Sequence, residues 1–114
     1  MTTEGKAKVY VLRPSRLGFA MGVKVFCNDK LIGKTKGGKF LEWELDPGTY
    51  TILSKAENAA TIELNVEAGK EYFLKQIIFP GFWRARNKIE VVEEAQARQD
   101  IQTCKPVKNQ AKYN

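Results

Sequence analysis

Apolar and polar residues alternate with a period of two along most of the chain, the pattern of strands with one buried face. The clearest run is at residues 61–66, where Ile62, Leu64 and Val66 share one face. Similar runs separated by turn residues predict eight short strands, at residues 8–12, 23–27, 31–35, 40–45, 49–55, 61–66, 72–79 and 88–92. Strands at this spacing without intervening helices predict an antiparallel sandwich or barrel.

The period changes near the end of the chain. Residues 93–101 contain strong helix formers, begin with two glutamates and include neither Gly nor Pro. We expect a helix at about residues 93–104, ended by Pro106. Ala97 and Ile101 are four residues apart and therefore share a helical face, which should pack on an open edge or face of the sandwich.

The length of 114 residues fits one domain that buries a single core. We expect a flexible N-terminus at residues 1–5, one β-sandwich domain at residues 6–102 and a flexible tail at residues 105–114. Two sheets of three or four strands would be filled by the apolar residues on the inward faces: Val9, Val11, Val25, Leu41, Trp43, Leu45, Ile52, Ile62, Leu64, Val66, Ile77 and Ile89.

Two polar segments predict tight connections between strands. Residues 28–30, Asn-Asp-Lys, read as the turn of a hairpin. Residues 34–39, Lys-Thr-Lys-Gly-Gly-Lys, superficially resemble a phosphate-binding loop, but such a loop needs a following helix and a strand pattern follows here. We therefore expect a second hairpin turn, with the Gly-Gly pair accommodating positive φ.

The composition excludes several chemistries. The chain has no histidine, so it offers no imidazole base, no Ser-His or Cys-His pair and no histidine ligand for zinc. Two cysteines do not make a four-thiolate site. We expect no enzymatic activity, no catalytic residues, no cofactor and no metal site.

The two cysteines lie far apart in the sequence and form no C-x-x-C motif. Cys27 alternates with Val23 and Val25 on one face of a predicted strand. We expect it to be a free, buried thiol; an even count also permits a disulfide with Cys104.

Charge is unevenly distributed along the chain, which carries a net charge of +6. Residues 1–36 hold eight basic and two acidic residues, whereas residues 37–67 hold two basic and six acidic ones. This balance favours contacts with anionic surfaces such as lipid headgroups, glycan phosphates or nucleic acid, although scattered lysines also serve solubility alone.

One predicted loop combines aromatic and basic residues. It contains Phe82, Trp83, Arg84 and Arg86, the residue types that dominate binding hot spots. We expect these four residues to contact a partner. The alternative is that Phe82 and Trp83 fold back to plug one end of the sandwich.

Four segments together carry a resemblance to a known family: residues 6–16, 25–34, 46–50 and 66–75. Over roughly residues 6–101 the chain resembles the bacterial family described as domain of unknown function 2846, and part of it is similar to PEGA repeats. The resemblance implies a mainly all-β fold, a transthyretin- or PEGA-like antiparallel β-sandwich of seven or eight short strands with one C-terminal α-helix. It also implies an exported protein or lipoprotein of the envelope or periplasm, and supplies no catalytic residues.

The resulting hypothesis is a non-catalytic β-sandwich module of the bacterial cell envelope that binds a protein or an envelope polymer. The alternative is a basic protein that binds an anionic polymer or nucleic acid, of which nucleic acid is the less favoured ligand. Membrane association is expected only through a lipid anchor removed from the chain, and a cytoplasmic location is the alternative to the envelope.

Overall fold

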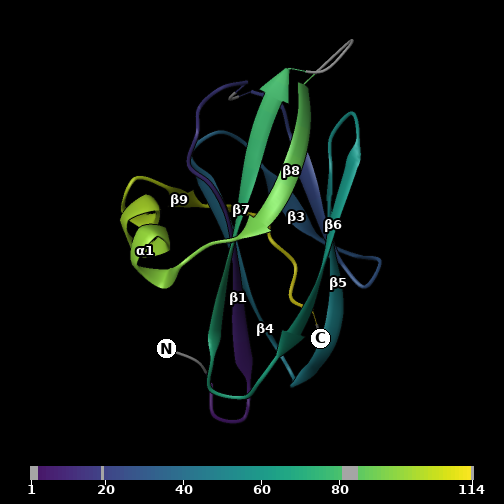
Figure 1. Cartoon of the computed structure of the whole chain (residues 1–114), viewed down its shortest axis with the longest axis vertical. Coiled ribbons are helices and arrows are strands. Elements are labelled where there is room, and N and C mark those ends of the chain that lie inside the picture. The colour runs from purple at the N-terminus through teal and green to yellow at the C-terminus, as the bar shows by residue number, and fades with distance from the viewer. Residues whose placement is uncertain (1–2, 19, 81–84, 114) are drawn as a thin grey trace.

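The computed structural model of the chain describes residues 3–18, 20–80 and 85–113. Two sheets pack face to face, and one helix, α1 (Glu94–Gln102), lies on the outer side of the larger sheet (Figure 1). The larger sheet has the order β8-β7-β1-β4-β9, with β1 (Ala7–Arg13), β4 (Lys39–Leu45), β7 (Glu71–Pro80), β8 (Ala85–Val91) and β9 (Lys105–Pro106). The smaller sheet has the order β3-β2-β5-β6, with β2 (Val23–Cys27), β3 (Lys30–Thr35), β5 (Gly48–Lys55) and β6 (Ala59–Val66). The predicted mainly-β sandwich with a C-terminal helix is confirmed.

Strand pairing is antiparallel with two exceptions among the described strands. The first strand, β1, lies in the middle of the larger sheet, antiparallel to β4 and parallel to β7. The short strand β9 is parallel to β4. The prediction of a wholly antiparallel sandwich is wrong for these two pairs, because neighbours that are distant in sequence need not run in opposite directions.

The two predicted tight connections have different outcomes. Asn28 and Asp29 have φ of 46° and 71°, as a type I′ turn requires, and they join β2 to β3 as the predicted hairpin. Residues 36–38 do form a turn, in which Gly38 has φ of 76°. However, β3 and β4 belong to different sheets, so the expected second hairpin is wrong and this turn carries the chain from one sheet to the other.

The core lies between the sheets and contains most of the predicted residues. Ile77 is the exception. The alternation of β7 directs Leu74, Gln76 and Ile78 inward, where they are buried, and leaves Ile77 half-buried on the outer face. Hydrophobicity alone predicted Ile77 in the core. That prediction is wrong because Gln76, with an amide side chain, occupies the inward position between Leu74 and Ile78.

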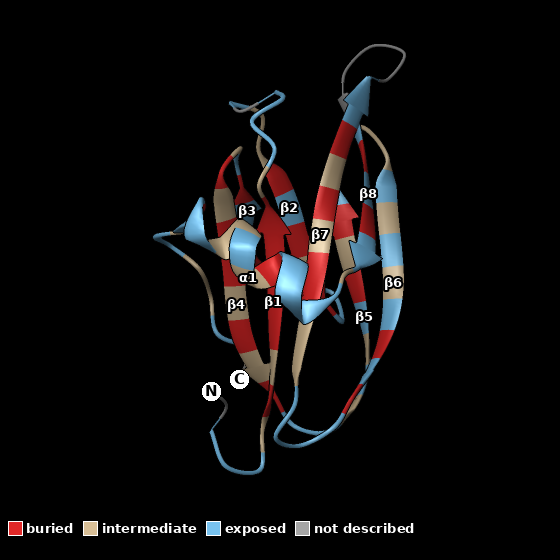
Figure 2. Ribbon diagram, turned by 60° about the vertical axis from the view of Figure 1, so that its left-hand side comes forward, coloured by how far each residue is buried: buried red, intermediate tan, exposed pale blue. Residues whose placement is uncertain are grey.

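The helix covers the outer face of the larger sheet, as predicted through Ala97 and Ile101 (Figure 2). Ala97 is fully buried and Ile101 is partly buried against Tyr10 and Phe73, whose rings stack with centroids 4.7 Å apart. Arg98 lies over both rings, 4.9 Å from the centroid of Phe73 and 5.6 Å from that of Tyr10. A second apolar layer therefore forms outside the sandwich and fixes the helix.

The structure differs from the expected flexible tail at residues 105–114. After β9, Val107 N donates to Phe40 O at 3.0 Å, and Ala111 N donates to Ile32 O at 2.7 Å. Val107 also packs against the core, as does Tyr113. Residues 105–113, called the strap below, thus run from β4 across to β3 and cover the seam where the edges of the two sheets meet. The reason is that both edges present unpaired backbone groups that the strap can satisfy.

We predict that Ala97→Asp destabilises the protein by roughly 3 kcal/mol or more, because it buries an unpaired carboxylate between helix and sheet. Ala95→Asp is the matched control, since Ala95 is exposed on the same helix. Chemical denaturation of both variants measures the difference. Equal stabilities would mean that the helix does not pack on the sheet.

Candidate anion-binding groove

The loop proposed from the sequence lies mostly outside the described residues. Phe82, Trp83 and Arg84 are outside the residues that the structure describes. Arg86 is described and exposed near the start of β8, opposite Phe79 of β7. The loop stays a prediction, and the described part of the chain offers a different candidate.

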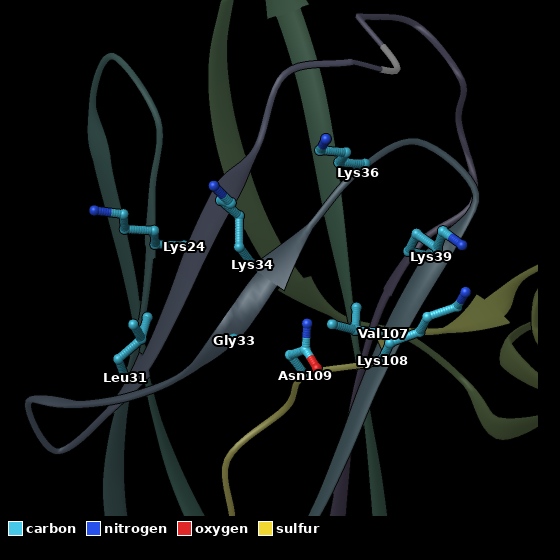
Figure 3. A pocket seen from close by; sticks show the side chains of 9 residues that line it. All are labelled: Lys24, Leu31, Gly33, Lys34, Lys36, Lys39, Val107, Lys108 and Asn109. Carbon is cyan, nitrogen blue, oxygen red and sulfur yellow. The ribbon is translucent and has the colours of Figure 1, made fainter.

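That candidate is a groove of about 530 Å³ at one end of the seam between the sheets (Figure 3). Its walls come from β2, β3, the turn after β3, the start of β4 and the strap. Five of its nine lining residues are lysines: Lys24, Lys34, Lys36, Lys39 and Lys108. The remaining lining residues are small, apolar or amide-bearing: Leu31, Gly33, Val107 and Asn109.

The groove carries uncompensated positive charge. Its described lining contains no carboxylate. Within residues 3–18, 20–80 and 85–113, none of the five lysines forms an ion pair; the ion pairs there involve Lys6, Lys8, Lys70 and Arg98. Lysines gathered around one concavity raise the local concentration of anions, because their fields add and water screens them less in a groove.

The strap builds one wall of the groove and is held there by its own contacts. The Gln110 side chain hydrogen-bonds both backbone groups of Glu42 in β4: Glu42 N donates to Gln110 Oε1 at 3.0 Å, and Gln110 Nε2 donates to Glu42 O. On β3, Gly33 allows close approach, since a Cβ there would lie 2.7 Å from Leu41 Cδ2 and 3.8 Å from Gln110 Cα. Lys108 is therefore positioned by hydrogen bonds on either side of it.

Arg13 organises the chain segments that carry the groove lysines. Its side chain is fully buried at the end of β1, and its guanidinium donates to Thr35 O at 3.0 Å, Met21 O at 2.6 Å and Gly18 O at 2.9 Å. Its own carbonyl accepts from Gly38 N at 2.8 Å. One residue thus ties the loop before β2, the end of β3 and the turn after β3 to the central strand. Burial lowers the pKa of this guanidinium.

A chain of buried polar side chains continues from the same place and crosses between the sheets. Thr35 Oγ1 donates to Gln76 Oε1 at 2.6 Å, Gln76 Nε2 donates to Ser54 Oγ at 2.7 Å, and Ser54 Oγ donates to Asn87 Oδ1 at 2.5 Å. These four residues alternate between the smaller and the larger sheet. Directional hydrogen bonds therefore fix the positions of these buried side chains, whereas the side chains in the rest of the core pack through apolar contacts.

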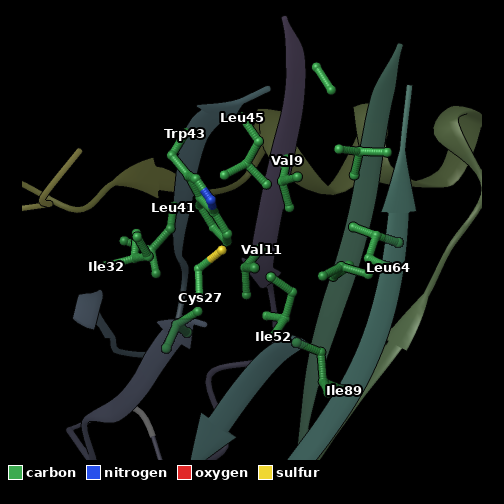
Figure 4. Packing of buried hydrophobic residues seen from close by; sticks show 14 residues of the cluster. Val9, Val11, Cys27, Ile32, Leu41, Trp43, Leu45, Ile52, Leu64 and Ile89 are labelled. Atoms are coloured by element: carbon green, nitrogen blue, oxygen red, sulfur yellow. The ribbon is translucent and has the colours of Figure 1, made fainter. Parts of the chain in front are cut away.

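The cysteines take no part in the groove. Cys27 is buried between the sheets, with its sulfur beside Trp43 (Figure 4), and burial raises the pKa of its thiol to about 11. Cys104 is buried with the helix on the outer face of the larger sheet, where burial also raises its pKa. Both thiols are free, and the prediction of a free, buried Cys27 is confirmed. The larger sheet lies between them.

Two absences concern only residues 3–18, 20–80 and 85–113. No group of three or more acidic, cysteine or histidine side chains lies close enough together to hold a metal ion. The helical part of the chain is too short and too polar to cross a membrane.

Comparison with known proteins gives the chain a family. Residues 3–88 match the family described as protein of unknown function (DUF2846). The chain belongs to this family. A relative from Haemophilus influenzae (strain ATCC 51907 / DSM 11121 / KW20 / Rd), described as "Uncharacterized protein", is 25% identical over 99 residues, which cover 86% of this chain and 59% of the relative. The chain thus spans less than two thirds of that relative's length.

The family assignment confirms the resemblance seen in the sequence. The matched residues include β1 to β7 and the first part of β8. They include four of the five groove lysines, whereas the helix and the strap, with Lys108, follow the matched range.

We predict that Arg13→Met costs roughly 3 kcal/mol of stability, because it leaves the carbonyls of Gly18 and Met21 without their charged donor. Arg16→Met is the control: Arg16 is exposed in the loop between β1 and β2, and its substitution should change stability by no more than about 0.5 kcal/mol. Urea denaturation of the two variants compares them. Similar small losses would show that Arg13 does not hold this end of the fold.

We also predict that neither thiol of the native protein reacts with a thiol reagent at about pH 8, because both are buried and their pKa values are raised. In denaturant both should react, and reduction should leave the mass unchanged. Rapid reaction of the native protein, or a mass increase on reduction, would contradict this account.

Proposed function

We propose that this DUF2846 chain is a non-catalytic binding module of the bacterial envelope that holds an anionic polymer in the lysine groove. The observation that carries the proposal is the groove itself: five lysines from β2, β3, β4, a turn and the strap, with no carboxylate in its described lining. Several amino groups around one groove favour a ligand that presents several negative charges in succession.

The chemistry of the lining favours binding over catalysis. The sequence contains no histidine, and lysine is the basic residue throughout the groove. A catalytic lysine needs a lowered pKa from burial or from a close cation on a fixed geometry. The four groove lysines outside the strap lie on exposed or half-buried positions of the surface, where they serve as point charges.

The lining also favours a glycan-type polymer over nucleic acid. Proteins that bind single-stranded nucleic acid combine basic grooves with aromatic side chains on which bases stack. None of the nine described lining residues is aromatic. The exported character that the family resemblance implies supports the proposed envelope location. The proposal also includes the loop with Phe82, Trp83, Arg84 and Arg86 as a second contact surface, for a protein partner.

We predict that Lys34→Gln/Lys36→Gln/Lys39→Gln weakens binding to polygalacturonate and to inorganic polyphosphate. Each lysine contributes about 1 kcal/mol at an anionic surface, so the affinity of the triple variant should fall roughly a hundredfold at low salt. The wild-type affinity should fall steeply with salt, and the triple variant should show a shallower dependence because fewer counterions are released. Isothermal titration calorimetry at several salt concentrations measures both effects.

The matched control is Lys70→Gln/Lys75→Gln/Lys88→Gln, which removes the same charge from the larger sheet and from the turn before β7. Its affinity should stay close to that of the wild type. If both triple variants lose affinity equally, the loss is explained by the net charge and not by the groove. If neither polymer binds the wild-type chain, the proposal is overturned.

A further inference from the structure

Beside the groove, three lysines form a row on the outer face of the smaller sheet. Strand register places Lys24 of β2 directly opposite Lys34 of β3 on one side and Lys55 of β5 on the other. All three are exposed, and neighbouring strands lie about 4.8 Å apart. Lys24 and Lys34 also line the groove, so the row extends it across the sheet to Lys55.

Folding gives no reason for this row. Like charges directly opposite each other on paired strands destabilise a sheet. Within the described residues, none of the three lysines has an ion-pair partner. The Lys34 stem lies over Gly22, where a Cβ would lie 2.4 Å from Lys34 Cδ. A row of like charges that costs stability, on a backbone register fixed by strand pairing, points to an anionic ligand.

A row of apolar side chains runs parallel to the lysines. Phe26 of β2 is opposite Leu31 of β3 and Leu53 of β5. Leu31 is 45% exposed, and Phe26 and Leu53 are half-buried. Phe26 and Leu53 are each two residues from a lysine of the first row, on the same face of the sheet. The surface therefore presents a cationic strip and an apolar strip side by side, both crossing β3, β2 and β5.

We infer that the ligand of this surface is a linear acidic polysaccharide with one carboxylate on each sugar, a polyuronate, lying across the three strands. This inference rests on the proposed function, because the row shares two lysines with the groove. A pyranose ring has an apolar C–H face that packs on aromatic and aliphatic side chains, and a uronate ring adds a carboxylate at its rim. One ring is about as long as the spacing of the strands, so a chain laid across the sheet places about one ring on each strand. The flexible lysine side chains then reach those carboxylates that turn toward them.

Other anions match the surface less well. Polyphosphate has charge but no apolar face for Phe26 and Leu53. A single-stranded nucleic acid has flat bases, but it would find only one aromatic side chain in these two rows. Glu63 of β6 lies exposed on the same sheet face, where it would oppose the close approach of an anionic bilayer to the whole face. These ligands are therefore the competing outcomes of the test.

The experiment titrates the full chain with an oligogalacturonate long enough to cross three strands, its methyl-esterified form and a polyphosphate of equal charge. We expect the oligogalacturonate to bind about tenfold tighter than polyphosphate, the difference that roughly 1.4 kcal/mol of apolar contact supplies. The methyl ester should not bind measurably. Amide shifts in NMR spectra should extend to residues of β5 with the oligogalacturonate, and should be confined to residues of the groove lining with polyphosphate.

Two substitutions separate the strips. Lys55→Gln, outside the groove lining, should weaken oligogalacturonate binding about fivefold, and Leu53→Thr by a similar factor, with polyphosphate binding unchanged. Lys75→Gln and Val91→Thr are the controls on the larger sheet, where Val91 is 56% exposed. Thermal melting verifies that each variant is folded, and the NMR map of the unmodified chain provides a readout that needs no substitution.

The outcomes distinguish this inference from the proposed function. Equal binding of both anions, dependent on Lys36 and Lys39 but not on Lys55 or Leu53, would overturn the polyuronate assignment and leave the groove in place. The same conclusion would follow if single-stranded DNA or anionic vesicles bound more tightly than oligogalacturonate. Binding that depends on Lys55 and Leu53 but not on Lys36 and Lys39 would support the row and overturn the groove.

Discussion

The buried guanidinium of Arg13 is the constraint on which this end of the sandwich depends. A buried charged group needs hydrogen-bond acceptors, and here three backbone carbonyls from two separate segments accept from the two terminal nitrogens, while Nε has no partner among the described residues. The loop before β2 and the end of β3 therefore have little freedom to move away from β1. Because the backbone of Arg13 also holds Gly38, the crossing from one sheet to the other is fixed at the same point.

This constraint links the interior to the surface. Thr35, whose carbonyl accepts from Arg13, starts the polar chain that reaches Asn87 on the far sheet, and its neighbours Lys34 and Lys36 line the groove. The buried hydrogen bonds of Thr35 thus fix the backbone that carries the surface lysines Lys34 and Lys36. Directional hydrogen bonds suit this purpose better than apolar packing, because they specify register and spacing together.

Much of the fold could be predicted from the sequence, because period-two alternation and turn residues are local signals. They located the strands, the hairpin at residues 28–29 and the helix with Ala97 facing the sheet. Sheet membership could not be predicted in this way: the Gly-Gly turn looks like a hairpin, and only the pairing of β4 with β1 shows that it joins two sheets. Gln76 and Arg13 were missed since hydrophobicity places neither in a core.

No local pattern in the sequence indicates the candidate groove. Its lysines are spread from Lys24 to Lys108, and charge along the chain showed only a basic beginning. The hairpin could have suggested that Lys24 and Lys34 face each other, but a register shift between Val25 and Phe26 makes such counting unreliable without coordinates. The pairing of Lys24 with Lys55, and the position of the strap, depend on contacts between distant parts of the chain.

The strap is the last described part of the groove to be synthesised. Residues 105–113 follow β8 and the helix in the sequence, so a ribosome makes them after β1 to β8 and α1. Until they emerge, the edges of β3 and β4 lack the backbone bonds at Ile32 and Phe40, and Lys108 is missing from its wall. A nascent chain therefore has an open seam and an incomplete groove until residues 105–113 dock.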